Sequence, residues 1–428
     1  MFARRIVVTG LGAVTPVGND VAQSWDALLS GRSGAAPLRG FSVNGSRPGY
    51  AAEIKDFAPE RAGLPRKKLK MMGRHAQLAF AAVQEACADA GLTGETPAVD
   101  RARLGILLGV GMLNADVMEL GRAFYETRQT SDAGPLDIAI FERVAATQLF
   151  PLWLLRHIPN LVAAHASIAL DAQGPSNTIA TGCVAAANAI GEAARLIARG
   201  DADVVIAGGA DARVSPLAML RYRDLGWLAT RDDVGPSAVS APFDRAAAGF
   251  VTGEAAAVLV LESLEHAQRR GARVRAEVAG YAAANDAYDL LQPHPEGCGL
   301  HRAMSACVRR SGEARPDVVF APAASVPAYN HAAASALRKT FNGHGPAVTA
   351  TRSIVGHTHA ASTGIDAVAA VLALETARVP PTINLRAPIA DFEFVGVGAR
   401  AHDVSHALVA AYSFGGHAAA LMLRRWAS

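Results

Sequence analysis

Residues 180–212, ATGCVAAANAIGEAARLIARGDADVVIAGGADA, join an alanine-rich segment to a run of small and β-branched residues. The alanine-rich part extends to Gly200, which predicts a helix that stops there. The composition of 201–212 predicts a buried strand. The same alternation recurs nearer the N-terminus, with a strand expected at 4–14 and a helix at 73–92. Short strands that alternate with longer helices predict an α/β fold.

The order of elements starts again in the second part of the chain. Strands are expected at 272–284 and 316–325 and helices at 298–312 and 335–341. The 428 residues also exceed the length of a typical single core. We therefore predict two units related by an internal duplication, residues 1–265 and residues 266–428.

The composition argues against several classes of protein. A net charge of +3 is too small to indicate nucleic-acid binding, so any basic site must be a local patch. The apolar segment 140–170 is interrupted by Pro151, Arg156, His157 and Pro159, so no membrane span is expected. Glycines interrupt the N-terminal segment before a signal peptide can form. Four cysteines lie without CxxC spacing, which favours a reducing cytoplasm: Cys87, Cys183, Cys298 and Cys307.

Cys183 permits two interpretations. A lone cysteine commonly serves as a small buried hydrophobe. Cys183, however, stands at the start of the expected helix, where the helix dipole and unpaired N–H groups stabilise a thiolate. Gly182 before it allows the backbone to approach a ligand closely. The segment therefore suits either a packing helix or a nucleophile.

Two other motifs do not predict a functional site. Gly10 and Gly12 are followed by Thr15 where a dinucleotide-binding loop requires a third glycine. His357 and His359 are potential metal ligands, but the sequence shows no companion Cys/His/Asp cluster around them. We therefore expect no metal site.

Several stretches occur in the same order as in a known family. They are GPSNTI and the opening segment (174–212), RRIVVTGLGAVTPVG (4–18), APFDRAAAGFVTGE (241–254), TRSIVGHTHAASTG (351–364), VPPTINL (379–385) and YSFGG (412–416). The chain thereby resembles the β-ketoacyl-acyl-carrier-protein synthases, the elongating ketosynthases of type II fatty-acid and polyketide synthesis. The resemblance implies a duplicated thiolase-like fold with five α/β/α/β/α layers, in which the first unit carries the cysteine.

The resemblance also implies an acyltransferase that works in two steps. Cys183 accepts an acyl group from a carrier-protein thioester, and a malonyl-type extender loses CO₂ and attacks that group. The N–H groups of Cys183 and Phe414 form the oxyanion hole, and the Phe414 side chain acts as a gate. His357 polarises the extender thioester, while Arg352 and Glu254 have supporting roles.

The segment FAPAASV (320–326) departs from the family pattern. Pro322 stands where the family has its first catalytic histidine, and Ala324 and Val326 replace two threonines that hold the phosphopantetheine arm. Removal of one oxyanion-type donor slows catalysis by roughly 10²–10³-fold. Acyl loading is therefore expected, whereas ordinary malonyl decarboxylation is in doubt. His359 and His417 permit two interpretations. Either one of them substitutes for the lost histidine, or both are residues of the surface or of the outer surroundings of the site.

A basic run near residue 66 has two interpretations. Arg66, Lys67, Lys68 and Lys70 form either a solvated surface or a docking site for an acidic acyl carrier protein, and the resemblance favours docking. The resemblance implies no bound cofactor, because the substrate arrives on the phosphopantetheine arm of the carrier. It also implies a dimer, either of two copies or with another ketosynthase-like chain.

Three functions follow from these observations. The first is an acyltransferase that loads Cys183 and passes the acyl group on, with carbon–carbon condensation as the expected outcome. The second is a non-catalytic subunit similar to a chain-length factor, which the lost histidine favours and the retained cysteine disfavours. The third is a full condensing enzyme in which another residue replaces the missing donor.

Overall fold

A computed structural model of the chain describes residues 4–39, 41, 49–64, 66–93, 99–111, 117–130, 136–312, 315–342, 345–398 and 403–427. Its core contains two sets of five strands. In the first set the spatial order is β1 (Ile6–Val14), β7 (Thr252–Ser263), β6 (Val204–Ala212), β4 (Leu104–Val110) and β5 (Ser176–Ile179). The first three of these strands pair antiparallel, whereas β6, β4 and β5 run parallel.

The second set repeats this arrangement. Its order is β8 (Ala276–Asn285), β12 (His417–Arg425), β11 (His406–Tyr412), β9 (Val318–Phe320) and β10 (Ala347–Thr349). The strands again pair antiparallel from β8 to β11 and parallel from β11 to β10. The two sets therefore share one order and one pattern of directions, as expected for a duplicated fold.

A short antiparallel pairing joins the two sets. Val7 pairs with Glu277 and Val8 with Ala276, which links β1 to β8. Two further strands, β2 (Ala36–Pro37) and β3 (Tyr50–Ala52), lie off this path, and β3 pairs with β7. The division of the chain at residue 265 stays a prediction.

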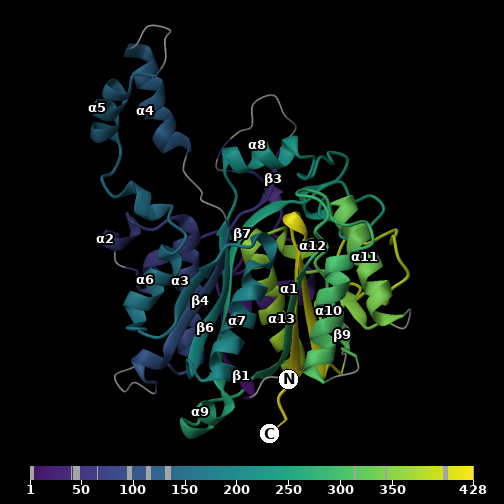
Figure 1. Cartoon of the computed structure of the whole chain (residues 1–428). Coiled ribbons are helices and arrows are strands. Elements are labelled where there is room, and N and C mark those ends of the chain that lie inside the picture. The colour runs from purple at the N-terminus through teal and green to yellow at the C-terminus, as the bar shows by residue number, and fades with distance from the viewer. Residues whose placement is uncertain are drawn as a thin grey trace.

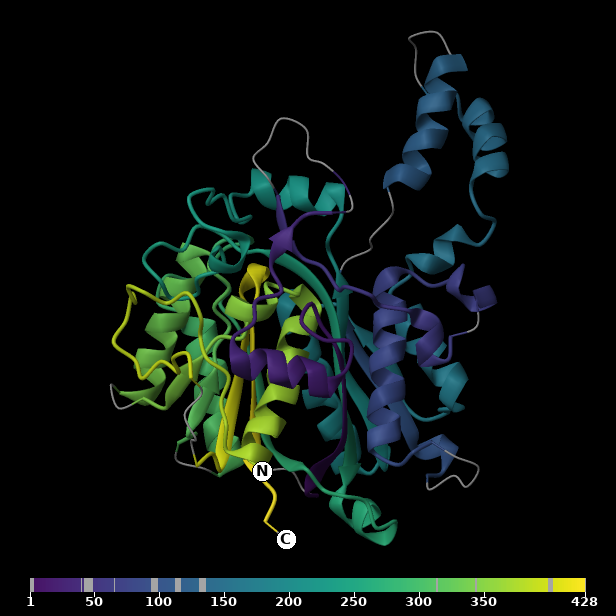
Figure 2. The same cartoon turned by 180° about the vertical axis from the view of Figure 1, so that it is seen from behind.

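Helices form three layers around the sheets (Figures 1 and 2). In the middle, α7 (Ala185–Arg199) and α13 (Ser362–Thr376) contact strands of both sets and each other. Outside the first set lie α3 (Arg74–Asp89) and α6 (Leu161–Leu170); outside the second lie α10 (Cys298–Ser311) and α11 (Pro327–Phe341). The result is the predicted α/β/α/β/α sandwich.

Shorter helices complete the body of the molecule. They are α1 (Val21–Ser30), α2 (Arg66–Leu69), α8 (Pro216–Asp224), α9 (Leu264–Arg269) and α12 (Arg352–Val355). Two more helices, α4 (Val117–Thr130) and α5 (Ile138–Gln148), contact each other and extend beyond the body as an arm (Figures 1 and 2). Within the described residues no helix combines the length and the apolar character that crossing a membrane requires.

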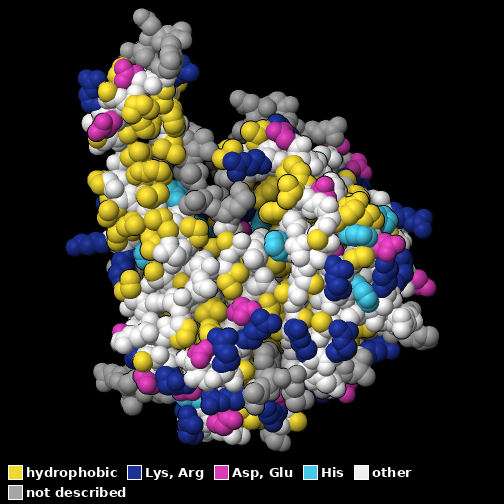
Figure 3. Space-filling view, viewed as in Figure 1, with side chains coloured by type: hydrophobic (Ala, Val, Ile, Leu, Met, Phe, Trp, Pro, Cys, Tyr) yellow, Lys and Arg dark blue, Asp and Glu magenta, His cyan; other side chains and the backbone are white. Residues whose placement is uncertain are grey.

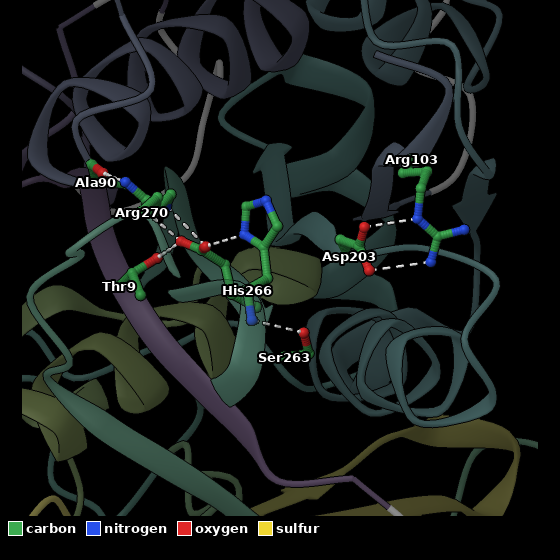
Figure 4. A network of polar contacts seen from close by, with 8 residues as sticks. Thr9, Ala90, Arg103, Asp203, Ser263, His266 and Arg270 are labelled. Carbon is green, nitrogen blue, oxygen red and sulfur yellow. Dashed lines mark hydrogen bonds and ion pairs between the residues drawn. The ribbon is translucent and has the colours of Figure 1, made fainter. Parts of the chain in front are cut away.

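A buried polar network ties β1 to the end of β7 (Figure 4). Glu262 accepts hydrogen bonds from Thr9, from Arg270 (Nε, 2.8 Å) and, at 2.8 Å, contacts His266 Nδ1. Arg270 also donates to the carbonyl of Ala90 at 2.8 Å. Burial alone would raise the pKa of Glu262, but these partners hold it below its usual value. The carboxylate therefore stays ionised and fixes α9 against the first sheet.

The elements differ from the sequence prediction in one segment. The strand expected at 316–325 contains only Val318–Phe320, and α11 begins at Pro327 instead of residue 335. Proline is favourable in the first turn of a helix because it has no N–H to leave unpaired. The residues between β9 and α11 form a connection that passes close to Cys183.

Candidate active site

Cys183 lies between a strand and the N-terminus of a central helix. It belongs to a 3₁₀ turn, η4 (Gly182–Val184), that connects the segment after β5 to α7. Its side chain is buried, with 6% exposure, yet it lines two cavities. The chain thus presents the sulfur atom at the helix start that the sequence predicted.

His357 faces this sulfur from the other unit. Its Nε2 lies 3.2 Å from Cys183 Sγ, and its Nδ1 lies 3.4 Å from Ser362 Oγ. The backbone of His357 is fixed to β7, because its N–H donates to Val251 O at 2.8 Å and its carbonyl accepts from Gly253 N at 2.9 Å. The tertiary structure therefore brings together two residues that are 174 positions apart.

Burial keeps both members of the pair neutral. It raises the pKa of the Cys183 thiol, an effect that the contact with Ser413 and the charge of Arg352 oppose. Burial, with a smaller contribution from Arg352, lowers the pKa of His357 to about 3. At neutral pH the pair is consequently a thiol beside a neutral imidazole.

Arg352 supports the site without touching the sulfur. It is fully buried, forms an ion pair with Asp366 at 3.0 Å and donates to the carbonyl of Ala321 at 3.0 Å. Thr351 also donates to Asp366, at 2.5 Å. The guanidinium therefore fixes the segment before Pro322 against α13 and contributes positive charge near Cys183.

The expected oxyanion hole is occupied in part. The N–H of Cys183 donates to Ser413 Oγ at 3.0 Å, so one of its two expected donors already has a partner. Gly182 makes this contact possible: a Cβ at that position would lie 2.4 Å from Ser413 Oγ. An incoming carbonyl oxygen must displace this hydroxyl or share it.

Two cavities of very different size meet at Cys183. The larger, of about 500 Å³, is lined by residues that include Asp211, Arg213, Trp227, Phe414 and His417. The smaller, of about 40 Å³, contains all three positions at which the sequence departs from the family pattern: Pro322, Ala324 and Val326. Phe414 lines both cavities, and its role as a gate stays a prediction.

Aromatic side chains occupy the surroundings of the smaller cavity. Trp227 and Phe250 form an apolar cluster with Ala324 and Val326. The Trp227 ring stacks on that of Phe414, with 6.0 Å between centroids. Apolar groups therefore stand at the two positions where the family pattern has threonines, although hydroxyl groups of Tyr222, Tyr329 and Ser413 also line this cavity.

The two extra histidines have different positions. His359 is buried and lines both cavities, and its ring lies 4.5 Å from that of His357. His417 is exposed and lines only the larger cavity. Of the two proposed substitutes, only His359 therefore shares a cavity with Pro322.

The structure also groups potential metal ligands that the sequence separates. One atom each of Cys183, His357 and His359 lie within 4.8 Å of one another. The sequence analysis found no companion for the two histidines because the thiol comes from a distant segment. A metal ion bound here would occupy the nucleophile, so this grouping does not assist acyl transfer.

Glu254, for which a supporting role is expected, is placed away from the sulfur. Its carboxylate forms an ion pair with Arg74 at 2.9 Å and accepts from the N–H of Ile54 at 3.0 Å. It lines neither of the two cavities at Cys183. Thr252, two residues earlier at the start of β7, contacts His359, whereas the Glu254 carboxylate binds Arg74 of α3.

The basic residues proposed for carrier docking are accessible. Arg66, Lys67, Lys68 and Lys70, on and just after α2, are exposed. Arg66 makes one contact with Glu60 at 3.7 Å between exposed groups, which contributes little stability. The cluster thus remains a positively charged surface.

Four residues of the site were not predicted from the sequence. Ser413, Asp211, Arg213 and Tyr222 all line a cavity at Cys183. One signal was available for two of them: Asp211 and Arg213 are charged residues directly at the end of a buried strand. The signal for Ser413 was its position beside Phe414.

Comparison with known families shows to which family the chain belongs. It matches the family "Beta-ketoacyl synthase, N-terminal domain" over residues 3–267 and "Beta-ketoacyl synthase, C-terminal domain" over residues 275–386. The chain belongs to the β-ketoacyl synthase family. Within this family it is 36% identical to the 3-oxoacyl-[acyl-carrier-protein] synthase 2 of Synechocystis sp., over 99% of this chain and 98% of the relative. It is also 36% identical to the enzyme of the same name from Coxiella burnetii, over 99% of each.

Solved β-ketoacyl synthase structures share the fold. The ishigamide ketosynthase/chain length factor superposes with a TM-score of 0.86 at 29% identity, over 99% of this chain and 100% of that one. A ketosynthase complex with a type II PKS acyl-carrier protein, bound to the hexaketide, gives a TM-score of 0.83 at 26% identity, with the same coverage. A β-ketoacyl synthase from Burkholderia phymatum gives 0.86 at 29%, again with the same coverage.

Proposed function

We propose that this member of the family is an acyltransferase that takes acyl groups from an acyl carrier protein onto Cys183 and passes them on. The observation that carries the proposal is the 3.2 Å contact between Cys183 Sγ and His357 Nε2 at the wall of a cavity of about 500 Å³. A nucleophile beside a neutral base, at a helix start and open to a cavity, is the arrangement that acyl transfer requires.

The loading step balances without a cofactor. Cys183 Sγ attacks the carbonyl carbon of the carrier thioester, and the S–H proton moves to His357 Nε2. The bond between that carbon and the pantetheine sulfur breaks, and the departing thiolate takes the proton. The products are an acyl-Cys183 thioester and the free thiol of the carrier.

The second step, condensation, has fewer hydrogen-bond donors available than the loading step. Carbon–carbon condensation with a malonyl-type extender requires its thioester carbonyl to be polarised while CO₂ leaves. His357 is available for this, whereas Pro322 cannot donate a hydrogen bond. We therefore propose that condensation is the outcome of the reaction but that decarboxylation of ordinary malonyl groups is slow.

Intact-mass spectrometry tests the loading step. The purified protein is incubated with an acyl carrier protein charged with a medium-length acyl group, and an adduct of the mass of that acyl group is expected. Cys183→Ala should abolish it, while Cys298→Ala, which changes the partly exposed thiol outside the site, should not. Absence of an adduct on the unaltered protein, or an adduct that survives Cys183→Ala, would reject the proposal.

The arrangement around Pro322 favours a second candidate, a non-catalytic subunit similar to a chain-length factor. The smaller cavity at Pro322 has a volume of only about 40 Å³, and a ketosynthase/chain length factor structure is among the neighbours. Such a subunit would shape the product of an active partner. A complex whose activity is unaffected by Cys183→Ala would support this candidate over the first.

We further propose that the chain acts as a dimer, either with a second copy or with another ketosynthase-like chain. Strand β5 forms the outer edge of the first sheet, and exposed apolar side chains lie on the neighbouring α6 and on the arm. An exposed sheet edge beside apolar side chains is suited to pairing. A cytoplasmic location, expected from the unpaired cysteines, stays a prediction.

A further inference from the structure

Ser413 lies against both the backbone and the side chain of Cys183. Its Oγ accepts the N–H of Cys183 at 3.0 Å, and the two side chains also share a hydrogen bond. Ser413 is 2% exposed and lines the smaller cavity together with Cys183 and His357. The buried sulfur therefore has a second polar partner besides His357.

The chain around Ser413 fixes the position of this hydroxyl. The Ser413 N–H donates to the carbonyl of His417, at the start of β12, with a distance of 2.9 Å. The N–H of Gly415, two residues after Ser413, donates to the carbonyl of Leu290 at 2.8 Å. On the side of the cysteine, the missing Cβ of Gly182 provides the space that Ser413 Oγ occupies. The backbone on both sides of the contact is thus arranged to bring the hydroxyl to Cys183.

The directions of these hydrogen bonds follow from the chemistry of the groups. A hydroxyl has one proton to donate and two lone pairs that accept. The backbone N–H of Cys183 can only donate, so it uses a lone pair of Ser413 Oγ and leaves the hydroxyl proton for another acceptor. Cys183 Sγ is an acceptor in contact with this hydroxyl.

A donor beside the sulfur counters the effect of burial. Burial raises the pKa of the Cys183 thiol, and the hydrogen bond with Ser413 is the largest contribution that opposes this rise. Burial also lowers the pKa of His357 to about 3. Both effects oppose the transfer of the S–H proton to the imidazole, so a group that stabilises the thiolate assists this step.

We propose that Ser413 is a further catalytic residue, whose hydroxyl donates to Cys183 Sγ and stabilises the thiolate as it forms. This inference rests on the proposed function. As the S–H proton moves to His357 Nε2, the charge on Sγ strengthens the hydrogen bond from Ser413, because ionised acceptors bind donors more strongly. When Sγ attacks the thioester, the charge passes to the carbonyl oxygen. The N–H of Cys183 then turns from Ser413 Oγ to that oxygen.

The pH dependence of thiol alkylation tests this role. The purified protein is treated with iodoacetamide from about pH 6 to pH 10, and modification of the peptide that contains Cys183 is followed by mass spectrometry. Ser413→Ala and Ser413→Gly each remove the hydroxyl. We expect both to shift the rate profile to higher pH by about one unit, because a hydrogen bond to a charged acceptor is lost. A purely structural role of Ser413 would not move this profile.

Acyl loading gives a second measurement. A shift of one unit lowers the thiolate fraction at neutral pH about tenfold, and the more basic thiolate recovers part of this loss through its greater nucleophilicity. Loading of Cys183 from the N-acetylcysteamine thioester of octanoic acid should therefore slow by about three- to tenfold in both variants, as measured by intact mass over time.

The matched control is Ser311→Ala. It removes the hydroxyl of another serine, with 1% exposure, that lines neither cavity at Cys183. This control should keep both the alkylation profile and the loading rate of the unaltered protein.

The outcomes separate the two proposals. If neither the thioester nor a charged carrier protein acylates Cys183 in the unaltered protein, the proposed function is wrong and the catalytic role of Ser413 falls with it. If loading occurs but a folded Ser413 variant, judged by circular dichroism, keeps the original alkylation profile, the role of Ser413 is wrong while the function stands. Unchanged or faster loading in such a variant would also overturn the role, because the hydroxyl would then only occupy the oxyanion hole.

Discussion

Gly182 determines which atom the backbone N–H of Cys183 contacts. Its φ of +64° lies in the region that glycine adopts without strain, and the missing Cβ leaves room for Ser413 Oγ. Ser413 in turn accepts the N–H of Cys183 at 3.0 Å. A single glycine before the nucleophile therefore couples the first unit of the chain to the loop that carries Phe414.

This coupling predicts non-additive stability changes. Gly182→Ala should destabilise the protein through backbone strain of roughly 1–3 kcal/mol together with the clash against Ser413. Ser413→Ala removes the clashing oxygen, so the double variant should be more stable than the sum of the single effects by roughly 0.5–3 kcal/mol. Urea denaturation of the four proteins measures this cycle, and strictly additive effects would contradict it.

At the scale of elements, α2 places a cluster of positive charges on a surface outside the site of the reaction. The helix has four residues, three of them basic. Figure 1 shows α2 on the outside of the molecule below the arm. An acidic carrier protein would meet positive potential here before its arm enters the site.

Charge reversal at α2 should slow loading from the carrier only. We expect Arg66→Glu/Lys67→Glu to reduce the rate of Cys183 acylation by acyl carrier protein about tenfold at low salt, because electrostatic steering raises encounter rates by ~10–10³-fold. Loading from small thioesters should be unchanged.

The control for this experiment reverses two other exposed arginines, Arg309→Glu/Arg378→Glu, which lie in the second unit. The control should leave both reactions unaffected. Equal losses with carrier and small thioester in the α2 variant would show that α2 affects folding of the site and not docking.

At the scale of the whole molecule, the arm and the edge of the first sheet leave apolar surface uncovered. Ile168 on α6, beside β5, is 71% exposed, and Tyr125 and Ile138 on the arm are similarly open. Figure 3 shows hydrophobic side chains gathered over the arm. Large exposed apolar patches commonly mark interfaces between proteins.

Sedimentation measurements can test pairing through this surface. A homodimer should show about twice the 44.3 kDa mass of one chain, and Ile168→Asp should shift it toward the monomer. Val397→Asp, at a position with 76% exposure in the second unit, is the matched control and should leave the mass unchanged. A monomer that pairs only with a second ketosynthase-like chain would indicate a heterodimer, and a monomer in both cases would contradict pairing.

The sequence alone determined much of the architecture. The alanine-rich run that became α7 and the strand that became β6 have local signals, as do the repeated strands and helices of the second unit. The start of α11 was misplaced because the strand expected before it covered residues 316–325, although Pro327 is a typical first residue of a helix. The position of Cys183 at a helix start was also predicted, because it and the order of family motifs are both properties of the chain itself; its role as nucleophile stays a prediction.

Only the tertiary structure decided what surrounds that cysteine. The partners of Cys183 come from positions 357 and 413, and those of Glu254 from positions 54 and 74. Distances across such long separations depend on how two sheets pack around α7 and α13, and no local pattern encodes them. The sequence therefore predicted a cysteine at a helix start as the acyl acceptor, whereas packing decided which groups surround that cysteine.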